Sequence, residues 1–89
     1  MIKVLNARDV GAITTDTQTY IGRPTKWGNP FIIGLDGSRL EVIEKYMDWF
    51  ITQQHLIDAL YELKGKNLVC WCSPCDCHGD FLLELANEI

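Results

Sequence analysis

The strongest pattern in the chain is the recurrence of apolar residues at helical spacing between residues 38 and 64. The first apolar stripe contains Leu40, Ile43, Met47 and Phe50. Ser38 and Glu41 stand at the spacing of a capping box, in which each side chain binds a backbone N–H group, so a helix is predicted to begin here and to run to about Gln53. A second stripe, residues 56–63, ends before Gly65, which is typical of a helix stop. The pattern is compatible with one kinked helix or with two helices.

Strand patterns lie on both sides of this helical region. Residues 2–6 alternate, residues 19–21 and 31–33 are short strand candidates, and residues 67–72 form the best strand candidate. Residues 7–18 are polar and predict a loop, and a final helix is expected to open at Gly79-Asp80. A strand, then helices, then a strand favours a parallel pair. We therefore expect one α/β domain over residues 1–89, a small sandwich with a short, mostly parallel sheet and flanking helices.

Composition and charge narrow the class of protein. The 89 residues are 47% hydrophobic and 22% charged, which excludes a disordered chain and a coiled coil. No apolar run is long enough for a membrane span, and the N-terminus lacks the pattern of a signal peptide, so we expect a cytoplasmic protein that does not bind membranes. The net charge of −4 argues against unspecific clamping of a nucleic-acid backbone, but the basic residues of the first half leave room for a cationic pocket.

The four cysteines all lie between positions 70 and 77, and three hypotheses account for them. Cys70, Cys72, Cys77 and His78 offer ligands for zinc, which proteins bind tetrahedrally through sulfur and nitrogen. Cys72 and Cys75 have the spacing of a thioredoxin-like redox pair. In the third hypothesis, Cys70 and Cys72 pack in the core, because cysteine is among the most buried residue types.

The third hypothesis places Cys77 and His78 where a strand turns into a helix. Free N–H groups and the helix dipole favour an anion there and lower the pKa of a thiol. Cys77 is then a candidate nucleophile, with His78 and Asp80 as acid–base partners, or the turn lines an anion pocket without chemistry. The alternative is a purely structural role, in which these residues only shape the turn.

The loop of residues 20–31 is the second candidate constellation. Arg23 is suited to bidentate binding of phosphate or carboxylate, and Lys26 adds a second cation. Tyr20 and Trp27 are candidates for stacking on a base, and Asn29 before a proline offers a directed amide. The alternative is a glycine- and proline-rich loop that caps the core with Trp27.

Taken together, the two constellations resemble a known family. The residues that carry the resemblance are Tyr20-Ile21-Gly22-Arg23, Trp27-Gly28-Asn29-Pro30-Phe31, Arg39, Tyr46, Cys70-Trp71-Cys72, Pro74 and Cys77-His78-Gly79-Asp80. They are similar to domain-of-unknown-function family 4326, small proteins of bacteria and bacteriophages, over nearly the whole chain. The family's activity is not established, and its pattern does not fix a cysteine at position 75. The closing strand–turn–helix, about twenty residues, also resembles unassigned family 488, which is regarded as Rossmann-like and nucleotide-related.

These observations support two functions of different classes. In the first, the loop after Tyr20 and the turn at Cys77-His78 share the carboxyl edge of the sheet and bind a nucleotide, another phosphorylated small molecule or a nucleic-acid end. Processing of that ligand by Cys77, His78 or Asp80 is an additional hypothesis. In the second, the domain is a non-enzymatic interaction module that binds a host protein. Its contact surface would be the acidic residues of the predicted helices, Glu41, Glu44, Asp48, Asp58 and Glu62. Stabilisation of this module by zinc at the Cys70–His78 cluster is an additional hypothesis.

Overall fold

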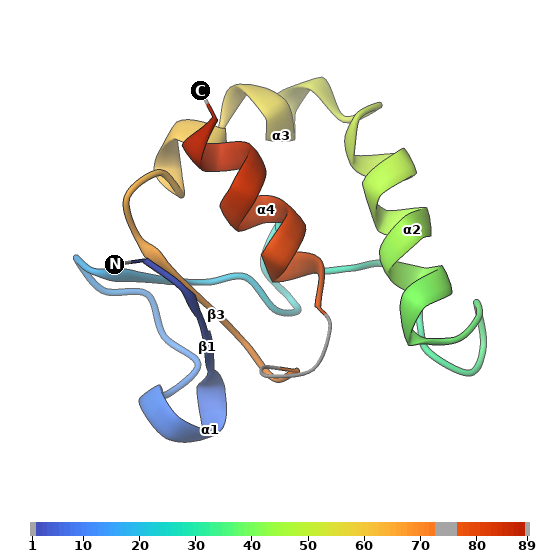
Figure 1. Ribbon diagram of the computed structural model, residues 1–89, viewed down its shortest axis with the longest axis horizontal. Coiled ribbons are helices and arrows are strands. Elements are labelled where there is room, and N and C mark those ends of the chain that lie inside the picture. Colours follow the sequence, from blue (N-terminus) through green and yellow to red (C-terminus); the bar gives the residue numbers. More distant parts are fainter. Residues whose placement is uncertain (1, 73–76, 89) are drawn as a thin grey trace.

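Three parallel strands form the centre of the fold. A computed structural model of the chain describes residues 2–72 and 77–88. Its strands are β1 (Val4–Asn6), β2 (Gln18–Tyr20) and β3 (Asn67–Cys70), in the order β1-β3-β2, with β3 parallel to both neighbours (Figure 1). This confirms the prediction of a small α/β fold with a mostly parallel sheet. The carboxyl ends of all three strands lie at one edge of the sheet.

The helices flank this sheet. They are α1 (Ala7–Val10), α2 (Arg39–Phe50), α3 (Gln54–Asp58), the 3₁₀ turn η1 (Leu60–Glu62) and α4 (His78–Asn87). The region of residues 38–64 thus forms separate helical segments, and it ends at Gly65, whose φ of 78° favours glycine. Helix α4 packs against β1 and β3, and α2 packs against α4 (Figure 1). No helix in the described ranges has both the length and the apolar character needed to cross a bilayer.

Two local expectations are wrong. Residues 7–18 are not only a loop, because Asn6 accepts a hydrogen bond from the Arg8 N–H group and caps the short helix α1. Residues 31–33 do not form a strand and contribute only an isolated bridge between Ile33 and Gly37. The Asp36 carboxylate accepts a hydrogen bond from the Ile32 N–H group, which folds this segment back on itself. Both differences arise from side chains that compete for backbone hydrogen bonds.

An aromatic cluster fills the core between α2, α4 and the loop before α2. Tyr46 and Phe50 are fully buried, and Phe81 meets both rings edge to face. The Tyr46 hydroxyl donates a hydrogen bond of 2.8 Å to the Trp27 carbonyl, which ties the loop to α2. Burial raises the pKa of Tyr46 above its ordinary value, which is already well above neutral pH, so this hydroxyl stays a hydrogen-bond donor. The loop of residues 22–31 is therefore held against the core and not left free.

The capping box at the start of α2 gives a first testable prediction. Ser38 Oγ accepts from the Glu41 N–H group at 3.3 Å, and Glu41 Oε1 accepts from the Ser38 N–H group at 2.9 Å. We expect Ser38→Ala to lower the free energy of unfolding by about 1 kcal/mol, because it leaves one N–H group at the helix start without its partner. Urea denaturation followed by circular dichroism measures this change. An unchanged midpoint would contradict a stabilising role for the box.

The same box predicts the direction of a pH effect. The hydrogen bonds from Ser38 hold the pKa of Glu41 below its usual value. A carboxyl whose pKa is lowered by folding stabilises the fold above its unfolded pKa, and this contribution is lost as the pH falls through the folded pKa. We therefore expect the destabilisation caused by Glu41→Gln to shrink as the pH is lowered in the acid range. A destabilisation that grows there would contradict the assignment.

Candidate functional site

A pocket opens at the carboxyl edge of the sheet, where ligands bind in open α/β folds. Its volume is about 300 Å³. The loop after β2, the first half of α2, the end of β3 and the start of α4 all contribute to its wall. The lining residues are Tyr20, Gly22, Arg23, Asn29, Phe31, Ile33, Arg39, Val42, Ile43, Cys70, Trp71, Cys72, Cys77 and His78.

Arg23 is fixed in the pocket wall by the loop in which it lies. Its Nε donates to the Asn29 carbonyl at 2.8 Å, and its Nη2 donates to the Phe31 carbonyl at 3.2 Å. The guanidinium group has five N–H donors, and these bonds engage two of them. The loop thus orients the plane of a cation at the pocket while leaving donors for a ligand.

Asn29 anchors the same loop to α2. Its Nδ2 donates to the Val42 carbonyl at 3.1 Å, and its Oδ1 accepts from the Phe31 N–H group at 2.8 Å. Both ends of the amide are therefore engaged by the protein. Asn29 lines the pocket, as expected, but its side chain primarily shapes the loop.

Two aromatic side chains form one wall. Trp71 follows β3 and its Nε1 donates to the Tyr20 hydroxyl at 3.0 Å, while this hydroxyl donates to the Arg23 carbonyl at 2.9 Å. Trp71 is 57% exposed and Tyr20 is half-buried, so ring surface remains open to a ligand. The chain of bonds connects the two strand ends to the arginine.

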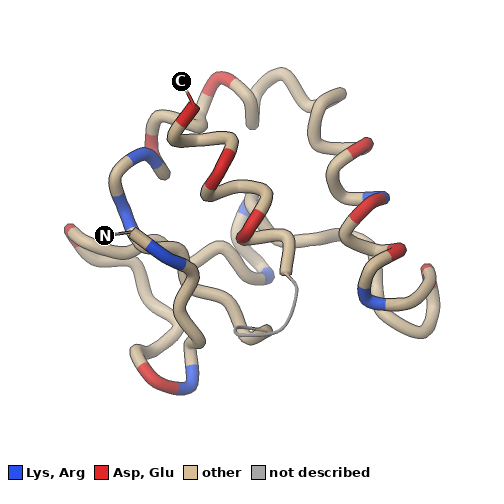
Figure 2. The backbone as a smooth tube through the Cα atoms, viewed as in Figure 1, with Lys and Arg blue, Asp and Glu red and all other residues tan. Residues whose placement is uncertain are grey.

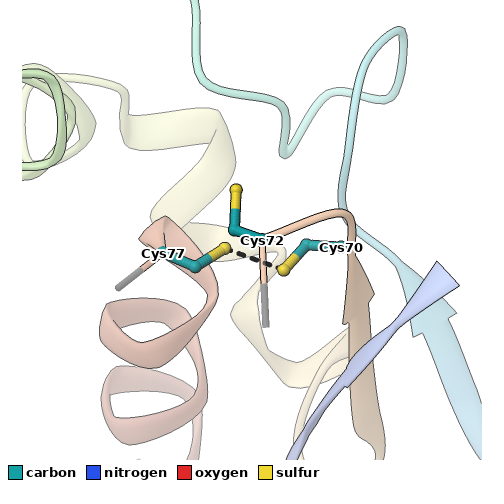
Figure 3. A group of neighbouring side chains, drawn as sticks. All are labelled: Cys70, Cys72 and Cys77. Carbon is teal, nitrogen blue, oxygen red and sulfur yellow. Dashed lines mark hydrogen bonds between the residues drawn. The ribbon is translucent and has the colours of Figure 1, made fainter. Parts of the chain in front are cut away.

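Three cysteines and a histidine form the floor. Cys70 ends β3, Cys72 follows it, and Cys77 caps α4, so their sulfur atoms converge and lie within 4.8 Å of one another (Figure 3). The Sγ atoms of Cys77 and Cys70 are 2.9 Å apart, with Cys77 donating. His78 Nδ1 lies 3.5 Å from Cys77 Sγ. Cys70 is buried in the core, as one of the three hypotheses expects, and Cys72 is half-buried.

The expected lowering of the pKa of Cys77 is wrong. The hydrogen bond that Cys77 donates to Cys70, together with burial, raises its pKa and outweighs the opposite effect of the Gly79 N–H group. Burial also lowers the pKa of His78. Both groups are therefore neutral at pH 7, and the pair lacks the thiolate that a cysteine nucleophile needs.

The structure does not bring three of the expected site residues to the pocket. Trp27 is 3% exposed and stacks on Phe50, because its large ring is buried in the core. Lys26 pairs with Glu62 at 2.9 Å and is not among the residues that line the pocket. Asp80 accepts from the Cys77 N–H group at 3.3 Å and serves the capping box of α4. The proposed redox partner, Cys75, lies outside the described residues.

Arg39 and Trp71 line the pocket although they were not expected as site residues. Trp71 comes directly after the carboxyl end of the central strand, a position that marks ligand sites in parallel sheets. Arg39 is the first residue of α2, against which the loop is anchored by the bond from Asn29 to the Val42 carbonyl. The sequence contains a signal for Trp71, whereas the place of Arg39 in the pocket depends on the tertiary fold.

The charges are distributed unevenly over the fold. Acidic residues recur along α2 and α4, and α2 also carries Arg39 and Lys45 (Figure 2). The described lining of the pocket, in contrast, contains Arg23 and Arg39 and neither aspartate nor glutamate. The net charge of the chain is −4, so this local cationic lining runs against the overall balance.

Comparison with known proteins shows a family match and two relatives, one from a virus and one from a phage. The family pattern described as Domain of unknown function (DUF4326) matches residues 4–88. The uncharacterized protein R718 of Acanthamoeba polyphaga mimivirus is 33% identical, over 88% of this chain and 73% of its own length. An uncharacterized 12.4 kDa protein in the nrdA-td intergenic region of Enterobacteria phage T4 is 35% identical, over 92% and 79%. No solved structure matches the chain.

Proposed function

The chain belongs to the family described as Domain of unknown function (DUF4326), and we propose that this member binds a small phosphorylated ligand of mononucleotide size. The ligand is a free nucleotide or the phosphorylated end of a nucleic acid. The observation that carries the proposal is the pocket lining, in which two arginines and the aromatic rings of Tyr20, Phe31 and Trp71 border a cavity without a described carboxylate. The proposal concerns binding and includes no reaction.

The arginines supply the anion site. Arg23 is held by two carbonyl groups, so little side-chain entropy is lost when its remaining N–H groups bind a phosphate. Arg39 lines the same cavity from the first turn of α2. Arginine binds phosphate oxygens through parallel N–H bonds, which favours a phosphate monoester over a spherical anion.

The aromatic wall and the size of the cavity limit the rest of the ligand. Trp71 and Tyr20 offer the kind of ring surface on which a nucleobase stacks, at about 1–3 kcal/mol per base. A volume of about 300 Å³ lies at the lower end of small-molecule sites. A mononucleotide or one terminal nucleotide therefore suits the pocket better than a dinucleotide cofactor.

Calorimetric titration with nucleoside monophosphates tests the proposal. We expect Arg23→Gln to weaken binding by roughly 10- to 100-fold, because a hydrogen bond between charged groups contributes about 1.5–3 kcal/mol. Lys26→Gln is the matched control, since it removes one positive charge from the same loop outside the pocket lining. Circular dichroism of each variant establishes that the fold is retained.

Further ligands and the control variant define which titration results would contradict the proposed binding of a phosphorylated ligand. Nucleosides without phosphate should bind weakly, and inorganic phosphate should compete with the nucleotide. A 5′-phosphorylated oligonucleotide, compared with the free nucleotide, separates the two sources of the ligand. An equal loss of affinity in Lys26→Gln would show a general charge effect and reject the pocket. The absence of binding by every phosphate compound would reject the proposal and favour the interaction module.

A further inference from the structure

We propose that the protein binds one thiophilic divalent metal ion, of the zinc class, through Cys70, Cys72 and Cys77, with His78 Nδ1 as the fourth ligand. The site forms the floor of the pocket described above. The proposal is independent of the proposed nucleotide binding, because its ligands are the sulfur atoms and the histidine and not the arginines.

The convergence of the sulfur atoms is the first observation. The three Sγ atoms lie within 4.8 Å of one another, although they come from the end of β3, the segment after it and the cap of α4 (Figure 3). Zinc–sulfur bonds of about 2.3 Å in a tetrahedral site place two sulfurs roughly 3.8 Å apart. The Cys70 and Cys77 sulfurs, now 2.9 Å apart, would therefore separate by about 1 Å, a change that small side-chain rotations supply.

The orientation of His78 is the second observation. Its Nε2 lies 3.0 Å from the Ile21 carbonyl, which only accepts hydrogen bonds, so Nε2 carries the ring proton. Nδ1 is then the unprotonated nitrogen and lies 3.5 Å from Cys77 Sγ. It stands outside the group of ligand atoms that all lie within 4.8 Å of one another, so the ring and the sulfurs of Cys70 and Cys72 have to approach each other when the metal binds. A tetrahedral site with zinc–nitrogen bonds of about 2.0–2.1 Å gives a nitrogen–sulfur distance of roughly 3.6 Å. The bond to the Ile21 carbonyl is also the outer-sphere contact that metal-binding histidines usually make.

The surroundings suit a metal–thiolate centre. The Gly79 N–H group already donates to Cys77 Sγ at 3.3 Å, and this bond would stabilise a thiolate. Binding releases three thiol protons to solvent, and three thiolates around a divalent ion keep one net negative charge. Arg23 and Arg39 line the same cavity and oppose that charge. Nothing in the described lining adds further negative charge.

Titration of the metal-free protein with Co²⁺ tests the proposal. We expect one equivalent to bind, with thiolate-to-cobalt charge-transfer bands and the visible bands of tetrahedral Co²⁺, and Zn²⁺ to displace it. Cys70→Ser and Cys77→Ser should abolish the charge-transfer bands at stoichiometric cobalt. His78→Ala should weaken binding by more than the roughly 10- to 100-fold lost with an outer-sphere partner. His55→Ala is its control, because His55 is exposed on α3.

A second measurement avoids the variants, in case they do not fold. X-ray absorption at the zinc edge of the wild-type protein should show three sulfurs and one nitrogen. Four sulfurs would overturn the role of His78, and a shell of oxygen and nitrogen would overturn the site. A wild-type protein that binds no Co²⁺ through sulfur, or one isolated with a Cys70–Cys77 disulfide, would also overturn it.

Discussion

Replacing Trp27 with alanine is expected to lower the free energy of unfolding by about 3–5 kcal/mol, the usual cost of deleting a buried aromatic side chain. The ring is 3% exposed, and its centroid lies 6.3 Å from that of Phe50 in a stacked arrangement. The cavity left behind would border Phe50 and Tyr46, both fully buried. Domains of this size are stable by only roughly 5–15 kcal/mol, so the variant would lose a large part of its stability.

Trp71→Ala is the matched control for this prediction. Trp71 is 57% exposed and donates one hydrogen bond, so its removal should cost only about 1 kcal/mol. The proposed ligand affinity, however, should fall by roughly tenfold or more, because Trp71 lines the pocket. Urea denaturation and calorimetric titration of both variants measure the two effects. Equal destabilisation by the two substitutions would contradict the assignment of Trp27 to the core.

The elements that could be predicted from the sequence are those fixed by local interactions. The capping box of Ser38 and Glu41 forms as expected, because its partners are three residues apart on the chain. The helix stop at Gly65 depends on the backbone of one residue. The strand of residues 67–70 is the most apolar, and it lies between the other two. In contrast, the failure of residues 31–33 to form a strand depends on the bond between Ile32 and Asp36, which no hydrophobic pattern shows.

The candidate site was predictable in part for the same reason. Arg23 and His78 line one pocket because both follow strands whose carboxyl ends share an edge, and this follows from parallel topology. The side of a loop on which a residue lies does not follow from the topology of the sheet. Trp27 turns into the core and Lys26 turns towards Glu62, since the partners of both come from distant helices. The pKa of Cys77 likewise depends on the position of Cys70, seven residues away, and not on the helix start alone.

Close packing of α4 on the sheet leads to the second large effect. A Cβ atom at Gly79 would lie 2.9 Å from Ile21 Cδ1 and 3.3 Å from Val4 Cγ1, so any side chain there meets the sheet. We expect Gly79→Val to lower the free energy of unfolding by about 3 kcal/mol, the upper part of the range for overpacked cores. Ile21→Ala should itself cost about 2–5 kcal/mol, because Ile21 is fully buried.

The double variant distinguishes this packing effect from an unfavourable conformational preference of valine in the first turn of a helix. Ile21→Ala removes three carbon atoms beside the three that Gly79→Val adds, and swaps that conserve core volume are tolerated best. The combined loss should therefore be smaller than the sum of the single losses by about 0.5–3 kcal/mol. The Ile21 carbonyl that accepts from His78 is kept in every variant. Additive losses in a urea double-mutant cycle would mean that Gly79 is required for the backbone of α4, and that its close approach to Ile21 is incidental.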